Sequence, residues 1–416
     1  MSLADAGLTV ELHSPRPVER YTPSTAEGIN VALDSHGEGD SPKVHFDETM
    51  AASAGKADAD FSMRMCDRAP EILSLLVGLG VPFTRTSAAK LDSRVEPPSE
   101  YHRAAYAWNE TGSCVHRVLC DQVRRLTVTG RIIKKEYFEV LDFILDEAGI
   151  CRGVITLDLK SMDIAPCAYD AVILAVGAPL AAYGDHLSIS DDFTPMISAY
   201  LRGARWAEPH AFRRLSSQKC IGGLLTDEIL QTDIPRLFAT GECAYLGKAE
   251  GLLPGNELLR GIYCALLCAS SVNKFIAKAQ LTQMEPDAAL FEKHCNDAEE
   301  KLLHIEPAVE TNSGEPLMNK TPACLFDELS ALMKHLAEPD HTLESLEEAK
   351  TILSGDIIPR FTALQAADRI RYANRDIPLA HRLRLLIIAC ETIIHSASME
   401  LSGGMESPII TKYLNK

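Results

Sequence analysis

The sequence predicts an α/β fold followed by a helical C-terminal bundle. Two apolar runs, Tyr169 to Val176 and Ile234 to Gly241, have the composition of strands buried in a parallel sheet, and glycine closes each of them. Between residues 130 and 159, short β-rich runs separated by turn signals predict a β-meander. After about residue 283 the apolar residues recur at helical spacing.

The N-terminal residues predict the end of a helix followed by a strand. Ala4 to Gly7 contains a glycine helix stop, and Leu8 to His13 has the composition of a short strand. In a dinucleotide-binding βαβ unit, a strand and a glycine-rich turn precede such a helix. We therefore expect the chain to begin inside a βαβ unit.

The next regions alternate between loops, helices and strands. Residues 34–45 are rich in Gly, Asp, Ser and Pro and predict a loop, and Asp47 to Gly80 has helical periodicity. Residues 184–216 carry no strong pattern and are expected to be irregular, whereas Glu257 to Ala277 predicts a helix. The predicted meander runs and C-terminal helices are Ile132–Ile133, Tyr137–Ile144 and Val154–Leu159, and then residues 285–303, 325–337, 342–353 and 377–397.

Composition and charge exclude several classes of protein. The 41 Lys and Arg residues against 58 Asp and Glu residues give a net charge of −17, which argues against a nucleic-acid partner. The best candidate for a membrane span, Leu383 to Ile394, is too short and contains Glu391, so it predicts a buried amphipathic helix. With no signal-peptide pattern either, we expect a cytoplasmic chain without a transmembrane segment of its own.

The twelve cysteines show no Cys-x-x-Cys pair and no zinc-type spacing. We interpret them as reduced, partly buried thiols, and we expect no metal site.

Four ordered segments resemble a known family, the flavoprotein subunit of succinate dehydrogenase and fumarate reductase, whose members are FAD-dependent oxidoreductases. The segments are Glu27–Leu33 with Gly37–Thr49; His102–Ala107 with Thr111–Gly112 and Asp121–Arg125; Cys151–Val154 with Ala171–Gly177; and Gly222–Leu224 with Ile234–Cys243 and Gly255–Asn256. The resemblance covers most of residues 5–275 and, more weakly, the helical tail.

The resemblance implies a partial FAD-binding, Rossmann-like domain of the glutathione-reductase type, with a β-meander, a largely absent capping domain and a C-terminal helical bundle. The expected domains are residues 1–183 for the first part of the FAD-binding-like domain, 184–219 for the capping remnant, 220–283 for its second part and 284–416 for the helical domain. Thirty-odd residues are too few for a packed capping domain.

Five positions match family residues that line the flavin: Gly28, Ala175, Gly177, Glu242 and Asn256. The family uses the residue that matches Glu242 to hold the flavin nucleotide. Taken alone, a glycine followed by Glu242 at a strand end also fits an ordinary turn with a solvated carboxylate. The resemblance therefore implies FAD as the cofactor at these positions, and we assign no catalytic residue.

Several departures concern the cofactor. The family opens with a Gly-x-Gly-x-x-Gly turn whose amides hold the flavin pyrophosphate, and this sequence begins after that element. The membrane-complex members attach flavin through a His, and the matching residue here is Tyr21. Glu27 stands where the family has glycine. We therefore expect FAD, when it is bound, to be held non-covalently.

Other departures concern a dicarboxylate substrate. The family's substrate-clamping Arg is matched by Leu252, which cannot bind a carboxylate, and Lys248 is only a point charge. The family's Arg-Gly-Ala-His near the C-terminus corresponds to Ser402–Met405. His102, Arg103 and the arginines of residues 202–214 would have to replace the clamp, but we interpret the latter as a solvated basic segment. Dicarboxylate binding is therefore doubtful.

Three interpretations stay open. The protein is a reduced-size flavin oxidoreductase with impaired or lost catalysis, a non-catalytic binding or assembly partner of a respiratory iron–sulfur or flavoprotein subunit, or an N-terminally incomplete gene product. An iron–sulfur subunit is the expected partner. We expect any contact with the inner face of a membrane to come only through partner subunits.

Overall fold

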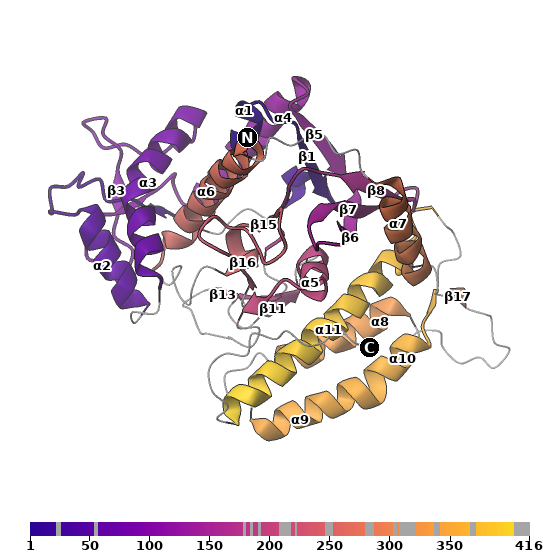
Figure 1. Ribbon diagram of the computed structural model, residues 1–416. Coiled ribbons are helices and arrows are strands. Elements are labelled where there is room, and N and C mark those ends of the chain that lie inside the picture. The colour runs from indigo at the N-terminus through magenta and orange to yellow at the C-terminus, as the bar shows by residue number, and fades with distance from the viewer. Residues whose placement is uncertain are drawn as a thin grey trace. The chain divides into compact units, whose positions relative to one another are not determined.

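The chain forms two compact units in the computed structural model, each built from two separate stretches of sequence (Figure 1). The first comprises Met1–Glu136 with Leu246–Lys278, and the second Tyr137–Tyr245 with Ala279–Lys416. The structure describes residues 1–21, 26–53, 57–177, 180–183, 186–189, 193–207, 218–220, 223–245, 253–278, 287–302, 306–307, 321–336, 342–366 and 372–402. The domain boundaries expected from the resemblance remain a prediction.

The first unit combines helices with two small sheets. Its helices are α1 (Ser2–Asp5), the 3-10 turn η1 (Val18–Arg20), α2 (Pro42–Ala52), α3 (Ala59–Leu79), α4 (Thr111–Val128) and α6 (Asn256–Lys278). Its strands are β1 (Val10–Ser14) parallel to β5 (Ile132–Glu136), and the antiparallel set β2 (Ile29–Asn30), β4 (Ala104–Ala105) and β3 (Ser93–Arg94).

The helical stretch expected from Asp47 to Gly80 is two helices, because Asp58 starts a second one. The Asp58 carboxylate accepts a hydrogen bond from the backbone N–H of Phe61 at 2.7 Å, which caps α3. Gly80 ends α3 with a left-handed φ of 102°. The apolar stripe of α3 is buried in the first unit, and its members include Phe61, Met65, Ile72, Leu73 and Leu76.

A β-meander is present as predicted, but Ile132–Ile133, predicted as its first strand, belongs to another sheet. Ile132 pairs with Val10 in the parallel ladder of β1 and β5, in the first unit. Its side chain is buried with Leu126 and Ala4 in a small cluster, so the apolar contacts of Ile132 are made there. The observed third strand of the meander, Ile164–Ala168, has no buried residue and contains Pro166, which disfavours a strand prediction.

The second unit contains the meander, short strand pairs and the C-terminal helices. Its strands are β6 (Phe138–Leu145), β7 (Cys151–Asp158) and β8 (Ile164–Ala168); β9 (Val172–Leu174) with β15 (Leu237–Ala239); β10 (Leu180–Tyr183), β11 (His186–Ile189) and β13 (Gln218–Cys220); β12 (Trp206–Ala207), β14 (Gly223–Leu225) and β16 (Ala244–Tyr245); and β17 (Glu306–Pro307) with β18 (Gln365–Ala366). Its helical elements are α5 (Thr194–Leu201), η2 (Gly241–Cys243), α7 (Ala288–Leu302), α8 (Pro322–Leu336), α9 (Leu343–Ile352), a π-helical turn (Leu353–Ile357), α10 (Ile358–Thr362) and α11 (Asp376–Leu401).

The two apolar runs predicted as parallel strands pair with each other. Ile173 of β9 lies opposite Phe238 of β15, and the ladder is parallel. Leu237, Phe238 and Ala239 are fully buried. The parallel interpretation is therefore confirmed for these two runs.

Part of the segment expected to be irregular forms the buried helix α5. All but one of its eight residues are buried, and Met196, Ile197 and Ala199 have no exposed surface. Because the helix is buried almost all round, its sequence has no polar face and therefore no helical periodicity to detect.

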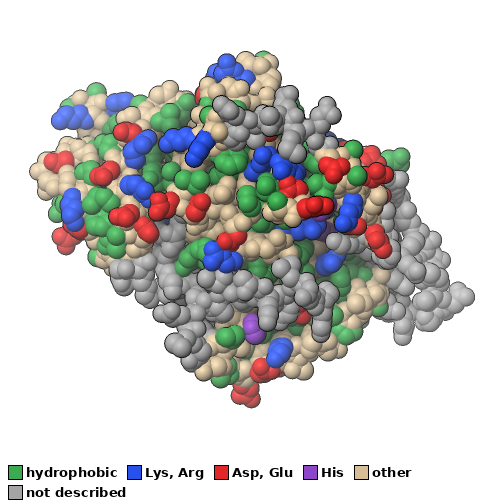
Figure 2. Space-filling model, viewed as in Figure 1, with side chains coloured by type: hydrophobic (Ala, Val, Ile, Leu, Met, Phe, Trp, Pro, Cys, Tyr) green, Lys and Arg blue, Asp and Glu red, His purple; other side chains and the backbone are tan. Residues whose placement is uncertain are grey.

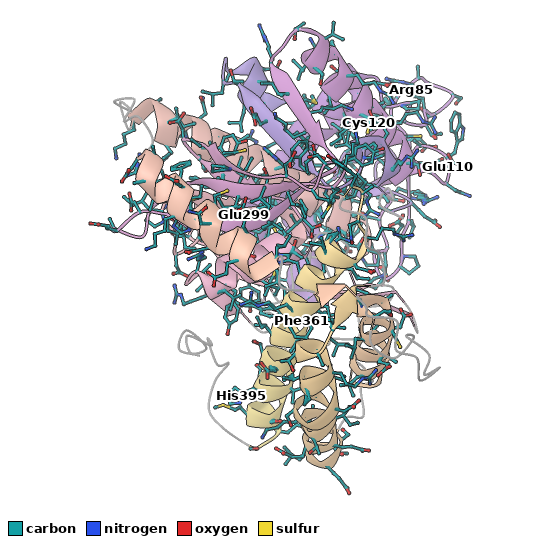
Figure 3. The ribbon with its side chains drawn as sticks, turned by 90° about the vertical axis from the view of Figure 1, so that its right-hand side faces the viewer. Arg85, Glu110, Cys120, Glu299, Phe361 and His395 are labelled. Carbon is teal, nitrogen blue, oxygen red and sulfur yellow. The ribbon has the colours of Figure 1, made fainter. Side chains whose placement is uncertain are left out.

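The C-terminal helices form one side of the same core. Helices α8, α9 and α11 lie side by side (Figure 1), and Leu383, Leu386 and Ile393 of α11 belong to the core cluster. Phe361 of α10 contributes to this cluster, whereas His395 projects away from α11 (Figure 3). The prediction that the Leu383 run is a buried helix is confirmed.

Charges are mixed on the molecular surface. On the face drawn in Figure 2, Lys and Arg side chains alternate with Asp and Glu side chains over the described residues. Within the described part of the chain, no helix is long and apolar enough to cross a bilayer, and no cluster of His, Cys, Asp and Glu could hold a metal ion. None of the eleven cysteines whose side chains the structure describes forms a disulfide.

The closest backbone approach in the meander gives a stability prediction. A Cβ at Gly153 of β7 would lie 2.0 Å from the carbonyl oxygen of Cys167 on β8, so Gly153→Ala should lower the free energy of unfolding by about 3 kcal/mol. Gly261→Ala in α6 is the matched control, because nothing described lies within 4 Å of its Cβ. It should stabilise by about 0.5–1 kcal/mol. Urea unfolding followed by circular dichroism measures both, and equal stability of the two variants would contradict the prediction.

Candidate cofactor site

The second unit places three predicted site residues at one edge of the β9–β15 pair. Both strands end at this edge, where the backbone N–H of Thr240 donates a 2.9 Å hydrogen bond to the carbonyl oxygen of Leu174. Ala175 and Gly177 follow β9, and Glu242 follows β15. Ligands of open α/β sheets bind at the carboxyl ends of parallel strands.

The backbone at this edge is open because two glycines adopt left-handed conformations. Gly177 has a φ of +75° and Gly241 a φ of +71°. Among the described atoms, a Cβ at Gly177 would meet only the Oε2 atom of Glu242, at 3.8 Å, and a Cβ at Gly241 would meet nothing within 4 Å. The side chains of Ala175 and Glu242 are exposed. As far as the described residues go, a flat group can approach the main chain beside the exposed carboxylate of Glu242.

The two residues that flank Gly241 and Glu242 are held differently. The Cys243 thiol is buried and donates to the carbonyl oxygens of Leu174 and Thr240 at 3.1 Å each, and burial raises its pKa to about 11. It is a structural thiol rather than a nucleophile. The hydroxyl of Thr240 is buried without a hydrogen-bond partner among the described residues. Sequence reasoning missed Thr240, and only its place at the strand end could have indicated it.

This edge fits a flavin nucleotide in the chemistry of its groups. A carboxylate accepts hydrogen bonds from the hydroxyls of a nucleotide, and glycine backbone gives the room that a ring or a phosphate needs. Gly177, Gly241, Glu242 and Ala175 would hold the group. The fit supports the predicted roles of these residues, which remain predictions.

In the first unit, Gly28 has a packing role of its own. It is buried, and a Cβ there would lie 2.9 Å from the Cβ of Ala104 and 2.9 Å from the Oε1 of Glu96. The strand pair β2–β4 therefore requires glycine at this position without reference to any cofactor.

Asn256 is at the start of α6 and is completely buried. Its Oδ1 accepts from the Nδ2 of Asn30 at 3.0 Å and from the Nε2 of His45 at 2.8 Å, and its Nδ2 donates to the hydroxyl of Thr49 at 3.0 Å. The side chain thus joins β2, α2 and α6. The predicted contact of Asn256 with flavin remains a prediction.

Among the described residues, the cations that could have replaced the substrate clamp are engaged within their own units. The Arg103 side chain is 1% exposed and binds Asp40 through Nε and Nη2, at 3.0 and 2.6 Å, and also contacts Glu48. The Nδ1 of His102 lies 2.7 Å from the carboxylate of Glu38.

In the segment interpreted as basic and solvated, Arg202 and Arg205 are paired with acidic residues and stay partly exposed. Arg202 pairs with Asp142 and Arg205 with Asp233, both through bidentate contacts. His210, Arg213 and Arg214, together with Lys248 and Leu252, lie outside the described residues.

Tyr21 is engaged at the end of β1. Its hydroxyl lies 2.9 Å from the hydroxyl of Ser14, and the guanidinium of Arg16 lies 4.3 Å from the centre of its ring. These contacts give Tyr21 a local role beside β1.

Comparison with known proteins shows which proteins part of the chain resembles. The family model described as "FAD binding domain" matches residues 1–189. Over 206 residues the chain is 40% identical to the succinate dehydrogenase flavoprotein subunit of Bacillus subtilis, covering 49% of this chain and 35% of that protein. Over the matched residues, the chain is similar to flavoprotein subunits of the succinate dehydrogenase and fumarate reductase type. FAD is the cofactor that this domain indicates.

A second relative and a solved structure agree. The 8-methylmenaquinol:fumarate reductase flavoprotein subunit of Wolinella succinogenes is 27% identical over 220 residues, which are 51% of this chain and 34% of that protein. The structure of Mycobacterium smegmatis Sdh1 in complex with UQ1 has a TM-score of 0.80 at 18% identity, covering 95% of this chain and 84% of that one, and therefore supports the fold. The chain spans about a third of the length of these two curated relatives.

The buried His45 gives a pH prediction. Burial lowers the pKa of its imidazole from 6.5 to about 4, so between these values the unfolded chain binds a proton that the folded chain does not. The stability that depends on neutral His45 is therefore fully present above pH 6.5. As the pH falls to 4, this effect should lower the free energy of unfolding by about 3 kcal/mol. Urea unfolding of the wild type and of His45→Gln at pH 7.5 and pH 4.5 measures this. The difference between the two proteins isolates His45 from the other titrating groups, and an equal loss in both would contradict the prediction.

Proposed function

We propose that this protein binds FAD without a covalent link and that its oxidation or reduction of dicarboxylates is impaired or lost. The observation that carries the FAD part is the open carboxyl edge of β9 and β15, where Gly177, Gly241 and Glu242 meet. When bound, FAD supplies the flavin ring that accepts or donates hydride. The chain supplies a hydrogen-bond acceptor in Glu242 and close backbone approach at the two glycines.

Non-covalent attachment is supported by Tyr21, which stands where the membrane-complex members have the linking His. Its hydroxyl is within hydrogen-bond distance of the Ser14 hydroxyl, and its ring makes a cation–π contact with the Arg16 guanidinium.

The proposal that catalysis is impaired is supported by the contacts of the arginines that could bind a dicarboxylate. A dicarboxylate needs two cationic contacts, and Arg provides the bidentate form. Leu252 replaces the family's clamping Arg, and Arg103, Arg202 and Arg205 are each paired with an acidic residue of their own unit.

The same observation favours a second function, a non-catalytic binding or assembly partner of a respiratory iron–sulfur or flavoprotein subunit. The core of the second unit is well packed, whereas Arg103, Arg202 and Arg205 each pair with an acidic residue of their own unit. In this role the chain would reach the inner face of a membrane through its partner.

The FAD proposal is tested by the absorption spectrum of the purified full-length chain and by FAD titration of the apoprotein. We expect a flavin spectrum and a Kd that Glu242→Gln raises about tenfold, because a charge-assisted hydrogen bond is lost. Glu299→Gln is the control, since Glu299 is an exposed carboxylate of α7 in the same unit (Figure 3). It should leave the Kd unchanged.

Two outcomes would contradict this expectation. A colourless protein that takes up no added FAD removes the cofactor assignment, and equal affinities of the two variants remove the role of Glu242. Acid precipitation should release all flavin into the supernatant, whereas flavin retained in the pellet would contradict non-covalent binding.

The substrate part has its own test. With FAD bound, dye-linked oxidation of succinate should not exceed the rate without succinate, because the carboxylate contacts are missing. The succinate dehydrogenase complex of Bacillus subtilis serves as the positive control. A succinate-dependent rate that saturates would show that catalysis persists and would favour the enzyme over the assembly partner.

A further inference from the structure

A buried polar network in the first unit joins residues that are far apart in the sequence. His45 of α2 and Asn256 of α6 are both fully buried and are joined by a 2.8 Å hydrogen bond. Asn30 of β2 donates through its Nδ2 to the carbonyl oxygen of Pro254 at 2.7 Å and to Asn256 Oδ1 at 3.0 Å. The backbone N–H of Asn30 also donates to the carbonyl oxygen of Gly255, at 3.1 Å.

The turn before α6 fits against Asn30 closely. Gly255 has a φ of +85°, and a Cβ there would lie 2.6 Å from Asn30 Oδ1. Only glycine therefore combines this left-handed turn with the contact to Asn30. Three consecutive residues, Pro254 to Asn256, are thus held by one asparagine.

The hydrogen-bond pattern fixes the protonation state of His45. The Pro254 carbonyl can only accept, so the atom of Asn30 that contacts it is the amide nitrogen. That nitrogen also contacts Asn256 Oδ1, which is therefore an acceptor. His45 Nε2 must then carry the proton that it shares with Asn256.

The opposite orientation of Asn256 is excluded by Thr49. The Thr49 hydroxyl donates to the carbonyl oxygen of His45 at 2.8 Å, so it accepts from Asn256 Nδ2. His45 therefore carries a proton on Nε2. Its Nδ1 is buried and has no hydrogen-bond partner among the described residues.

Burial is the main reason why a second proton on His45 is disfavoured. The charged groups that face it are Arg103, which opposes protonation, and Asp40, which favours it. Asp40 is already held by two contacts to Arg103, through Nε and Nη2. The imidazole therefore acts as a fixed donor across the physiological range.

We propose that His45 is a positioning residue for the start of α6, acting through Asn256. The proposal rests on the proposed FAD function, because Asn256 matches a position where relatives line the flavin. The Nε2–H donor keeps the Asn256 carboxamide turned toward Asn30, and this holds the Pro254–Asn256 turn and the first turn of α6 in one arrangement. Loss of the donor should weaken FAD binding without unfolding the unit.

Two substitutions at position 45 separate the donor from the bulk of the side chain. Gln places its amide nitrogen near the position of Nε2, whereas the shorter Asn reaches only the position of Nδ1. FAD titration of the full-length apoprotein at pH 7.5, followed by flavin fluorescence, should show a Kd about tenfold higher for His45→Asn. The Kd of His45→Gln should stay within about threefold of the wild type.

A control variant tests whether any loss is merely a loss of stability. Leu126 is buried in the cluster of α1, α4 and β5 in the same unit, so Leu126→Ala should lower the unfolding midpoint while leaving the Kd for FAD unchanged. If His45→Asn fails to fold, Thr49→Val replaces it, because it removes the acceptor of Asn256 Nδ2 with little change in shape. This variant should also raise the Kd several-fold.

The outcomes separate the two levels of the proposal. A wild type that binds FAD, with His45→Asn and Thr49→Val binding equally well, overturns the role of His45 and leaves the proposed function standing. A Kd that rises in Leu126→Ala as much as in His45→Asn also overturns it, since stability alone would explain the loss. A wild type that binds no FAD overturns the proposed function, and the inference with it.

Discussion

The parallel pairing of β9 with β15 is the constraint on which the candidate site depends. The two strands come from stretches more than sixty residues apart, and pairing in parallel makes both of them end at the same edge. The residues that follow each strand are therefore brought together without any direct attraction between them. The left-handed glycines then turn the chain away from the edge and leave the carboxylate of Glu242 free. A register shift of one residue would move Glu242 relative to Gly177 and would reverse the buried face.

The first unit uses polar groups in a different way. Arg103, Asp40 and Glu48 form an internal ion cluster, and His45, Asn256 and Asn30 form an internal hydrogen-bond network. Internal polar groups of this kind are costly unless every member has a partner, and they then specify one arrangement of the elements. Arg103 is in this way held by two acidic side chains of its own unit. The polar residues of this unit are used for architecture.

The sequence allowed the long and repetitive features to be predicted. The runs that became β9 and β15 were recognisable because they are continuous and end in glycine, and α11 because its apolar spacing extends over many turns. Helix α5 was missed because eight residues buried almost all round carry no periodicity. Ile132 was assigned to the wrong sheet because a short apolar run does not say which strand it pairs with. His45 was missed because its partner Asn256 lies 211 residues away, and nothing local distinguishes a buried imidazole from a solvated one.

The interleaving of the two units has a consequence for synthesis on the ribosome. The first unit contains Met1–Glu136 but also needs α6, which ends at Lys278. At about 5–20 residues per second, its earlier part therefore waits on the order of ten seconds for its last helix. During this interval Asn30 and His45 lack the carboxamide that they later share, and the α3 face that packs on α6 is uncovered. The nascent chain is then open to chaperones and to aggregation, and the arrival of α6 ends that period.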